Sequence, residues 1–164
     1  MRGYIKMHED YITLAKPFIQ ATQHVISTMA FVQATPGKPY VKKGLTAPGD
    51  VSAIIGFTGD RNGTMALSFT KKCAIFILKN MLGDDIQDIV QDIKETVGEL
   101  TNMISGQSRA NLSQMGINLQ ASIPTIILGD NHTIEHMKQC TIVTTPFNTS
   151  SGDFFVEFSL EQLA

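Results

Sequence analysis

The stretch DIQDIVQDIKETVGELTNMIS, residues 85–105, has the most regular hydrophobic pattern in this 164-residue chain. Its apolar residues recur at steps of three and four, which is the spacing of one face of an α-helix. The predicted buried stripe consists of Ile86, Val90, Ile93, Val97, Leu100 and Ile104. We therefore expect a long amphipathic helix from about Asp85 to Ser105, whose pattern allows a continuation past Gly106. Asp84 and Asp85 suit its N-cap and first turn.

The opposite face of this helix carries polar and small residues. At about 100° per residue, the positions facing away from the buried stripe are Asp88, Glu95, Glu99, Asn102 and Gly106. Glu99 and Asn102 are one turn apart, so their side chains project side by side. A solvated polar surface would explain such a face. A solvated face is the commoner case for such a pattern. However, asparagine is a poor helix former, and Glu95 and Glu99 are like charges at i, i+4, so a docking surface is the alternative interpretation.

The remaining pattern predicts an α+β fold. A first helix is expected from His8 to about Met29, with Pro17 as a kink or a restart. The order helix, strands, helix, helix, strands lacks the alternating units of a parallel doubly wound sheet. Each half is a long helix followed by strands, which suggests an internal duplication. The further expected elements are strands at 40–42, 51–57, 64–69, 119–127, 140–145 and 154–159, and a helix at 72–81 closed by Gly83.

The composition narrows the class of protein. Hydrophobic residues make up 43% of the chain, charged residues 17%, and the formal net charge is −2. The length suits one domain over residues 1–164, and the charge balance argues against nucleic-acid binding and against disorder. The N-terminus has no apolar leader and no apolar run reaches the length of a membrane span. We therefore expect a cytoplasmic protein with no membrane partner, whose Cys73 and Cys140 are reduced.

A resemblance to a known family comes from the segment GELTNMISG, residues 98–106, with Pro124 twenty-two residues beyond Asn102. This segment resembles the Glu-x-x-Asn signature of the CheC/CheX/FliY chemotaxis phosphatases, and CheX most of all. The likeness covers about residues 8–160 and implies a CheC-like fold, with long helices packed on an antiparallel-rich sheet. The family pattern commonly has Asp or Ser at the position of Glu95, so the chain departs from the family there.

The resemblance also implies an activity and a set of site residues. Proteins of this family hydrolyse the aspartyl phosphate of a phosphorylated CheY-type response regulator. By resemblance, Asn102 would position the attacking water and Glu99 would pair with the receiver's lysine. Glu95, Met103 and Gly106 would contact the partner. The resemblance implies no cofactor of the chain's own, since the receiver supplies Mg²⁺, and it implies a homodimer formed by edge-strand pairing.

Two other interpretations are open at this point. One is a non-catalytic CheX-like module that docks a receiver or a flagellar switch protein, although such a module would not need the carboxamide of Asn102. The other is a metal enzyme, because His132, Glu135 and His136 match the H-x-x-E-H string of some zinc proteases. A chance match explains that string better, since it follows a turn signal and leads directly into a predicted strand.

Overall fold

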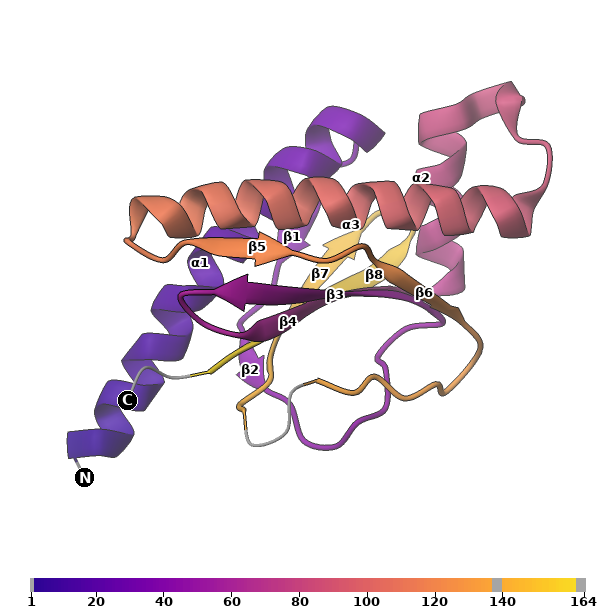
Figure 1. Ribbon diagram of the computed structural model, residues 1–164. Coiled ribbons are helices and arrows are strands. Elements are labelled where there is room, and N and C mark those ends of the chain that lie inside the picture. The colour runs from indigo at the N-terminus through magenta and orange to yellow at the C-terminus, as the bar shows by residue number, and fades with distance from the viewer. Residues whose placement is uncertain (1, 137–139, 162–164) are drawn as a thin grey trace.

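Helices cover one face of an antiparallel sheet in this protein (Figure 1). The computed structural model describes residues 2–136 and 140–161. The element bounds are α1 Arg2–Ala30, β1 Thr35–Pro36, β2 Tyr40–Val41, β3 Val51–Gly59, β4 Gly63–Phe69, α2 Lys71–Leu82, a 3₁₀ turn Gly83–Asp85, α3 Ile89–Gln114, β5 Leu119–Ala121, β6 Thr125–Leu128, β7 Val143–Thr149 and β8 Gly152–Leu160. The expected α+β class, with long helices packed on an antiparallel sheet, is confirmed.

The sheet is built from two hairpins, β3–β4 and β7–β8, which pair with each other through β4 and β8. Its order is β1-β7-β8-β4-β3-β5, with β2 also paired to β7 and β6 also paired to β3. The short strands of each half of the chain therefore pair with the hairpin of the other half: β1 and β2 pair with β7, and β5 and β6 pair with β3. The order reads symmetrically about the β8–β4 contact, which is the arrangement that a duplicated unit would produce. The duplication itself stays a prediction.

The main hydrophobic core lies between the sheet and the helices. Alternate residues of β3 (Val51, Ala53, Ile55 and Phe57) are buried on this side, as the period of a strand requires. Phe18 of α1 stacks on Phe158 of β8 with ring centroids 4.4 Å apart. Leu100 and Ile104 of α3 are fully buried in the same core. The helix that carries the predicted site is thus held by the largest packed unit of the molecule.

The start predicted for the long helix is wrong, whereas the allowed continuation past Gly106 is confirmed. Asp84 and Asp85 form a separate 3₁₀ turn, and Asp88 is the N-cap because its carboxylate accepts hydrogen bonds from the backbone N–H groups of Val90 and Gln91 at 3.1 and 3.3 Å. The helix then continues to Gln114. Consequently Ile86 precedes the helix, and Val90, in its first turn, is 56% exposed rather than buried.

The other element predictions are confirmed with local corrections. The hairpin of β3 and β4, the helix α2 closed by Gly83, the short strand β2 and the strand β8 are all present. The expected strand at 119–127 is two strands, and the strand expected at 140–145 runs instead over β7, so Cys140 precedes it. Pro17 does not interrupt α1. Within the described ranges, no helix has the length and apolar character needed to cross a membrane.

Candidate functional site

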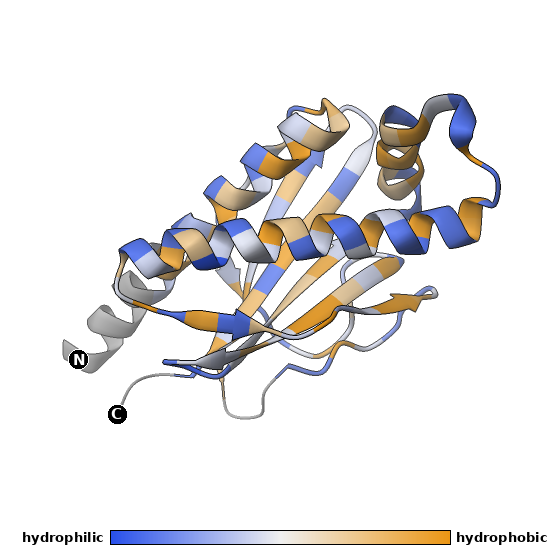
Figure 2. Cartoon of the chain, turned by 45° about the horizontal axis from the view of Figure 1, so that its top comes forward, coloured by the Kyte–Doolittle hydropathy of each residue, from blue (hydrophilic) through white to orange (hydrophobic). Residues whose placement is uncertain are grey.

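The predicted site lies on the solvent side of α3, where Figure 2 shows hydrophilic residues along the helix. The opposite side of α3 is buried through Ile93, Val97, Leu100, Ile104 and Leu112. A hydrogen bond at 3.0 Å from the Asn111 carboxamide to the backbone carbonyl of Pro17 fastens α3 to α1. These contacts make α3 a rigid support for the side chains on its outer face.

Glu99 and Asn102 are both exposed on this outer face. Within the part of the chain that the structure describes, neither side chain has a hydrogen bond or ion pair to another residue. Their i, i+3 spacing places the carboxylate and the carboxamide next to each other. A carboxamide that donates and accepts hydrogen bonds, beside a carboxylate, is thus presented together to whatever approaches the helix.

Gly98 and Gly106 flank Asn102 on the same stripe, one turn to either side. A Cβ added at Gly98 would meet Ile126 Cδ1 at 3.5 Å, and one added at Gly106 would meet Arg109 Nη2 at 3.8 Å, both ordinary contacts. Packing within the chain therefore does not require glycine at either position. A glycine inside a helix costs about 1 kcal/mol relative to alanine. The two glycines lower the surface on both sides of Asn102, which leaves room for a partner to come close.

The other two predicted contact residues differ in how available they are. Glu95 is exposed one turn before Glu99, and its carboxylate accepts a hydrogen bond from the Gln91 side-chain amide at 3.2 Å. Met103 is partly buried and packs against the main core, so only part of its side chain is open to a partner. Of the predicted contact residues, Glu95 is thus exposed on the outer face, whereas Met103 and Gly106 are both partly buried.

The segment 122–124 links β5 to β6 and passes beside the middle of α3 (Figure 1). Two hydrogen bonds between Ser122 and Gly56 fix this segment to β3. Ser122 donates its backbone N–H to the carbonyl of Gly56 at 2.9 Å, and its hydroxyl accepts the Gly56 N–H at 2.9 Å. Pro124, the residue that the family spacing pointed to, is half-buried here. Ile123 next to it is 88% exposed, and the sequence pattern did not single it out.

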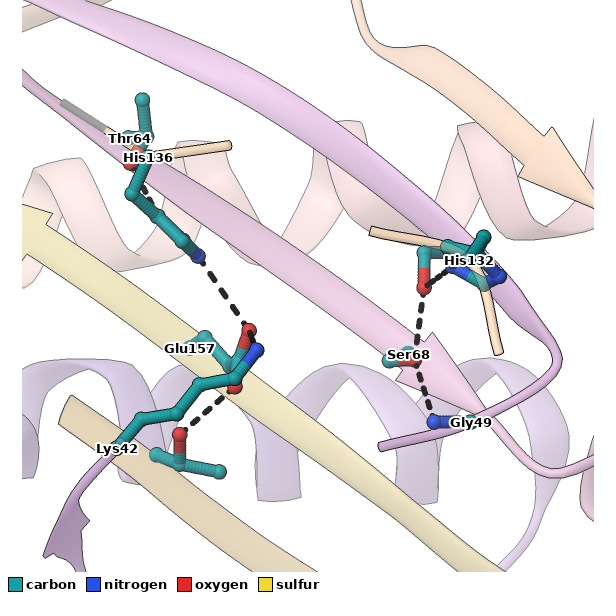
Figure 3. A network of polar contacts seen from close by, with 9 residues as sticks. Lys42, Gly49, Thr64, Ser68, His132, His136 and Glu157 are labelled. Carbon is teal, nitrogen blue, oxygen red and sulfur yellow. Dashed lines mark hydrogen bonds and ion pairs between the residues drawn. The ribbon is translucent and has the colours of Figure 1, made fainter. Parts of the chain in front are cut away.

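The histidines of the H-x-x-E-H string lie on the other face of the sheet (Figure 3). His132 contacts the carbonyl of Gly129 and the hydroxyl of Ser52, at 2.6 and 2.7 Å, while Glu135 is exposed. His136 contacts Thr64 and the Glu157 carboxylate. All four ring nitrogens are thus engaged at two separate places, and the described ranges contain no group of three or more His, Cys, Asp or Glu residues placed to hold a metal. Within the described residues, the string therefore does not gather its side chains at one place.

Glu157 is a fully buried carboxylate at the centre of this second face (Figure 3). Lys42 Nζ lies 3.0 Å and His136 Nε2 3.3 Å from its Oε1, and the Thr144 hydroxyl donates to Oε2 at 2.8 Å. Burial by itself raises the pKa of Glu157, but the bonds from His136, Lys42 and Thr144 outweigh burial and hold the pKa below its usual value. This network stabilises the fold and does not touch the outer face of α3.

The comparisons with known proteins agree on one family. The family model described as chemotaxis phosphatase CheX matches residues 51–148. The crystal structure of a chemotaxis protein CheX from Desulfovibrio desulfuricans is 56% identical, with a TM-score of 0.87, and the match covers 91% of this chain and 99% of that one. A CheX–CheY–BeF3–Mg²⁺ complex from Borrelia burgdorferi contains a chain that is 23% identical, with a TM-score of 0.76 and coverage of 90% and 97%. The CheY-P phosphatase CheX of Thermotoga maritima is 23% identical over 150 residues, which is 90% of this chain and 96% of that protein.

Proposed function

Because this chain belongs to the CheX family of chemotaxis phosphatases, we propose that it hydrolyses the aspartyl phosphate of a CheY-type response regulator. The observation that carries the proposal is the exposed pair of Glu99 and Asn102, one turn apart on a firmly packed helix and without partners among the described residues. The names of the Thermotoga and Borrelia relatives, a CheY-P phosphatase and a complex with CheY, support the same substrate class.

The proposed reaction needs positioning more than new chemistry. A water oxygen bonds to phosphorus while the bond from phosphorus to the aspartyl oxygen breaks, which yields inorganic phosphate and a free carboxylate. Orientation of the water and neutralisation of the phosphoryl oxygens supply nearly all of the rate in such transfers. The receiver would bring the phosphoaspartate, the Mg²⁺ and a lysine, so this chain would need no cofactor of its own.

Asn102 would orient the attacking water. Its carboxamide both donates and accepts hydrogen bonds and carries no charge, so it would not repel the phosphoryl group. An aspartate at the same position would repel that group. The rigid packing of α3 would hold the carboxamide in place when the helix enters the receiver's site.

Glu99 would pair with the lysine of the receiver through a charge-assisted hydrogen bond. This pair would fix the register of α3 on the receiver, since Asn102 is only one turn away. Glu95 and Gly106 would widen the same contact on either side, with a smaller share from the partly buried Met103.

The direct test is Asn102→Ala, with phosphate release followed from a CheY-type receiver phosphorylated by acetyl phosphate in Mg²⁺ buffer. We expect the stimulated rate to fall by at least about 100-fold, the effect of removing one well-placed polar group, with an unchanged melting temperature. Gln23→Ala, an exposed amide on α1, is the matched control and should keep the wild-type rate. An Asn102→Ala variant with full activity would exclude the assignment, and a wild-type protein that binds without accelerating release would be a docking module.

We further infer that the chain acts in the cytoplasm as a homodimer, as the resemblance implies. The outer strands β1, β2, β5 and β6 are two to four residues long, so edge pairing would rest on a short contact. Light scattering after size-exclusion chromatography should give twice the chain mass of 17.9 kDa, and a monomer at every concentration would contradict the dimer.

A further inference from the structure

We propose that Ile123 is an apolar docking contact for the phosphorylated receiver, placed beside Asn102 by a β-bulge. This inference rests on the proposed function and extends its site from α3 to the neighbouring strand edge. Ile123 is the most exposed large apolar side chain in the ranges 11–136 and 140–161, at 88%. The pairing of β5 and β6 with β3 explains why Ile123 is exposed and on which face of the sheet it lies.

The bulge follows from the pairing register of β3. Ala121 pairs with Phe57 and Thr125 pairs with Ile54, so the three residues 122–124 oppose the two residues 55–56. One extra residue on the outer strand is the definition of a β-bulge, a feature that re-aims side chains and is frequent beside active sites.

The bulge changes which residues face the helices. Before it Ala121 lies on the helix side, opposite Phe57, and after it Ile126 lies on that side, opposite Ala53. Strict alternation cannot place both an odd and an even residue on the same side, so one pair of neighbours at the bulge must share a side. We infer that this pair is Ile123 and Pro124, on the helix side, since Pro124 is half-buried like Ala121 and Ile126, whereas Ser122 and Thr125 are exposed. Ile123 thus belongs to the face of the sheet on which α3 lies.

The position of Ile123 along α3 follows from a contact at Gly98. A Cβ added at Gly98 would touch Ile126 at 3.5 Å, which puts these two residues side by side. The three residues from Ile126 back to Ile123 span about 10 Å of strand. The helix covers this distance in about seven residues, and in fewer once the bulge has shortened the strand. Because β6 lies beside the N-terminal half of α3 and β5 beside its C-terminal half (Figure 1), the step back from Ile126 leads toward the turn that contains Asn102 and Gly106. Ile123 is therefore level with that turn.

The linker is rigid, so Ile123 has a fixed place before any partner binds. Ser122 is held by two hydrogen bonds to Gly56, and the ring of Pro124 fixes its own backbone angle. A preformed apolar contact adds affinity at little cost in conformational entropy. The exposed carboxylate of Glu99 lies one turn before Asn102 on α3, so the complementary receiver face would carry an apolar side chain next to a basic group.

A receiver explains this exposure better than a second copy of the chain does. Strand addition at the β5–β6 edge would meet the bulge and the missing N–H of Pro124, both of which oppose pairing. A receiver docked over Asn102 would cover Ile123 without needing that edge. The second copy is therefore an outcome of the test rather than the expected occupant.

The test compares Ile123→Ser with Leu45→Ser, a change on the segment that covers the other face of the sheet, where Leu45 is 50% exposed. The measurements are KM and kcat on the acetyl-phosphate-treated receiver, binding of the receiver loaded with beryllofluoride and Mg²⁺, and the mass in solution. We expect Ile123→Ser to raise KM and the dissociation constant by about tenfold with kcat within about twofold. Ile123→Val should restore both, and Leu45→Ser should match the wild type.

Unchanged binding by Ile123→Ser would overturn the inference, as would equal losses in the two serine variants. A change in mass for Ile123→Ser alone would also overturn it and assign the residue to contact between copies. Because binding is measured separately from turnover, full activity of Asn102→Ala would remove the catalytic proposal while the binding result still decides the role of Ile123.

Discussion

Asn102 and Glu99, neighbouring side chains on α3, would act through different forces, so their effects can be measured separately. The carboxamide of Asn102 is neutral, so its effect depends on geometry and should appear in kcat. The carboxylate of Glu99 carries a charge that no described residue of the chain neutralises. Its effect should appear in complex formation and should weaken as salt screens it.

Glu99→Ala should therefore lower both binding and turnover. Loss of one charge-assisted hydrogen bond, about 1.5–3 kcal/mol, corresponds to a drop of about 10- to 100-fold in kcat/KM. Glu95→Ala, which removes a carboxylate one turn away, should have a smaller effect because that group already accepts a bond from Gln91. Titration of the phosphorylated receiver at low and high salt measures this. Wild-type kcat/KM in Glu99→Ala would contradict the proposed pair.

At the scale of the element, α3 has one face packed against the core and an outer face whose residues lower the stability of the helix. Thr101 sits in the buried half, where its hydroxyl donates to the carbonyl of Val97 at 2.7 Å. The outer half contains two glycines and an asparagine, all weak helix formers. Because packing within the chain does not require those glycines, we infer that access to the helix surface explains them.

Gly106→Ala separates the two roles. A Cβ at this position has ordinary contact distances, so the helix should gain about 0.5–1 kcal/mol in the free energy of unfolding, measured with urea. The same methyl group would stand between α3 and the receiver, so KM should rise. Ala110→Gly, at an exposed position one turn further on, is the converse control and should lower stability without changing KM. A Gly106→Ala variant with unchanged KM would show that the receiver does not approach this turn.

At the scale of the whole molecule, the two faces of the sheet are covered differently and have different roles. The helix side holds the main core and supports the site. The other side is covered by the segments 42–50 and 129–136, which are joined by the bridge of Thr46 with Thr133 and by the hydrogen bond from Ala47 N–H to the carbonyl of His132 at 2.8 Å. Lys42 and His136 in these coverings bind the buried carboxylate of Glu157.

The buried network predicts a loss of stability in acid. The pKa of Glu157 is held below its ordinary value of 4.5 in the folded state, so its contribution to the free energy of unfolding is fully present above about pH 4.5. That contribution disappears as the pH falls from there through the folded pKa. Glu157→Gln lacks this titration, so the stability gap between wild type and variant should narrow on acidification. Urea unfolding from pH 7 to pH 3 measures the gap, and a constant gap would contradict the prediction.

The local sequence pattern predicted the helices, but it did not predict where α3 begins, because more than one residue could serve as its N-cap. The face that carries Glu99 and Asn102 follows from the 3.6-residue period, and the structure leaves both exposed. The start of α3 was misplaced because Asp85 and Asp88 are equally good caps by residue type. Only the chain's path from α2 makes Asp88 the cap.

The sequence by itself determined the α+β class, the period of α3 and the residues on its outer face, because these depend on neighbours three or four positions apart. Tertiary structure alone decided that Ile123 is exposed beside α3 and that Glu157 is buried with Lys42 and His136. The bulge exists only through the register of β5 and β6 on β3, and the buried network joins residues 21 and 115 positions apart. Register and long-range pairing are set by the packing of the whole sheet, and no local period encodes them.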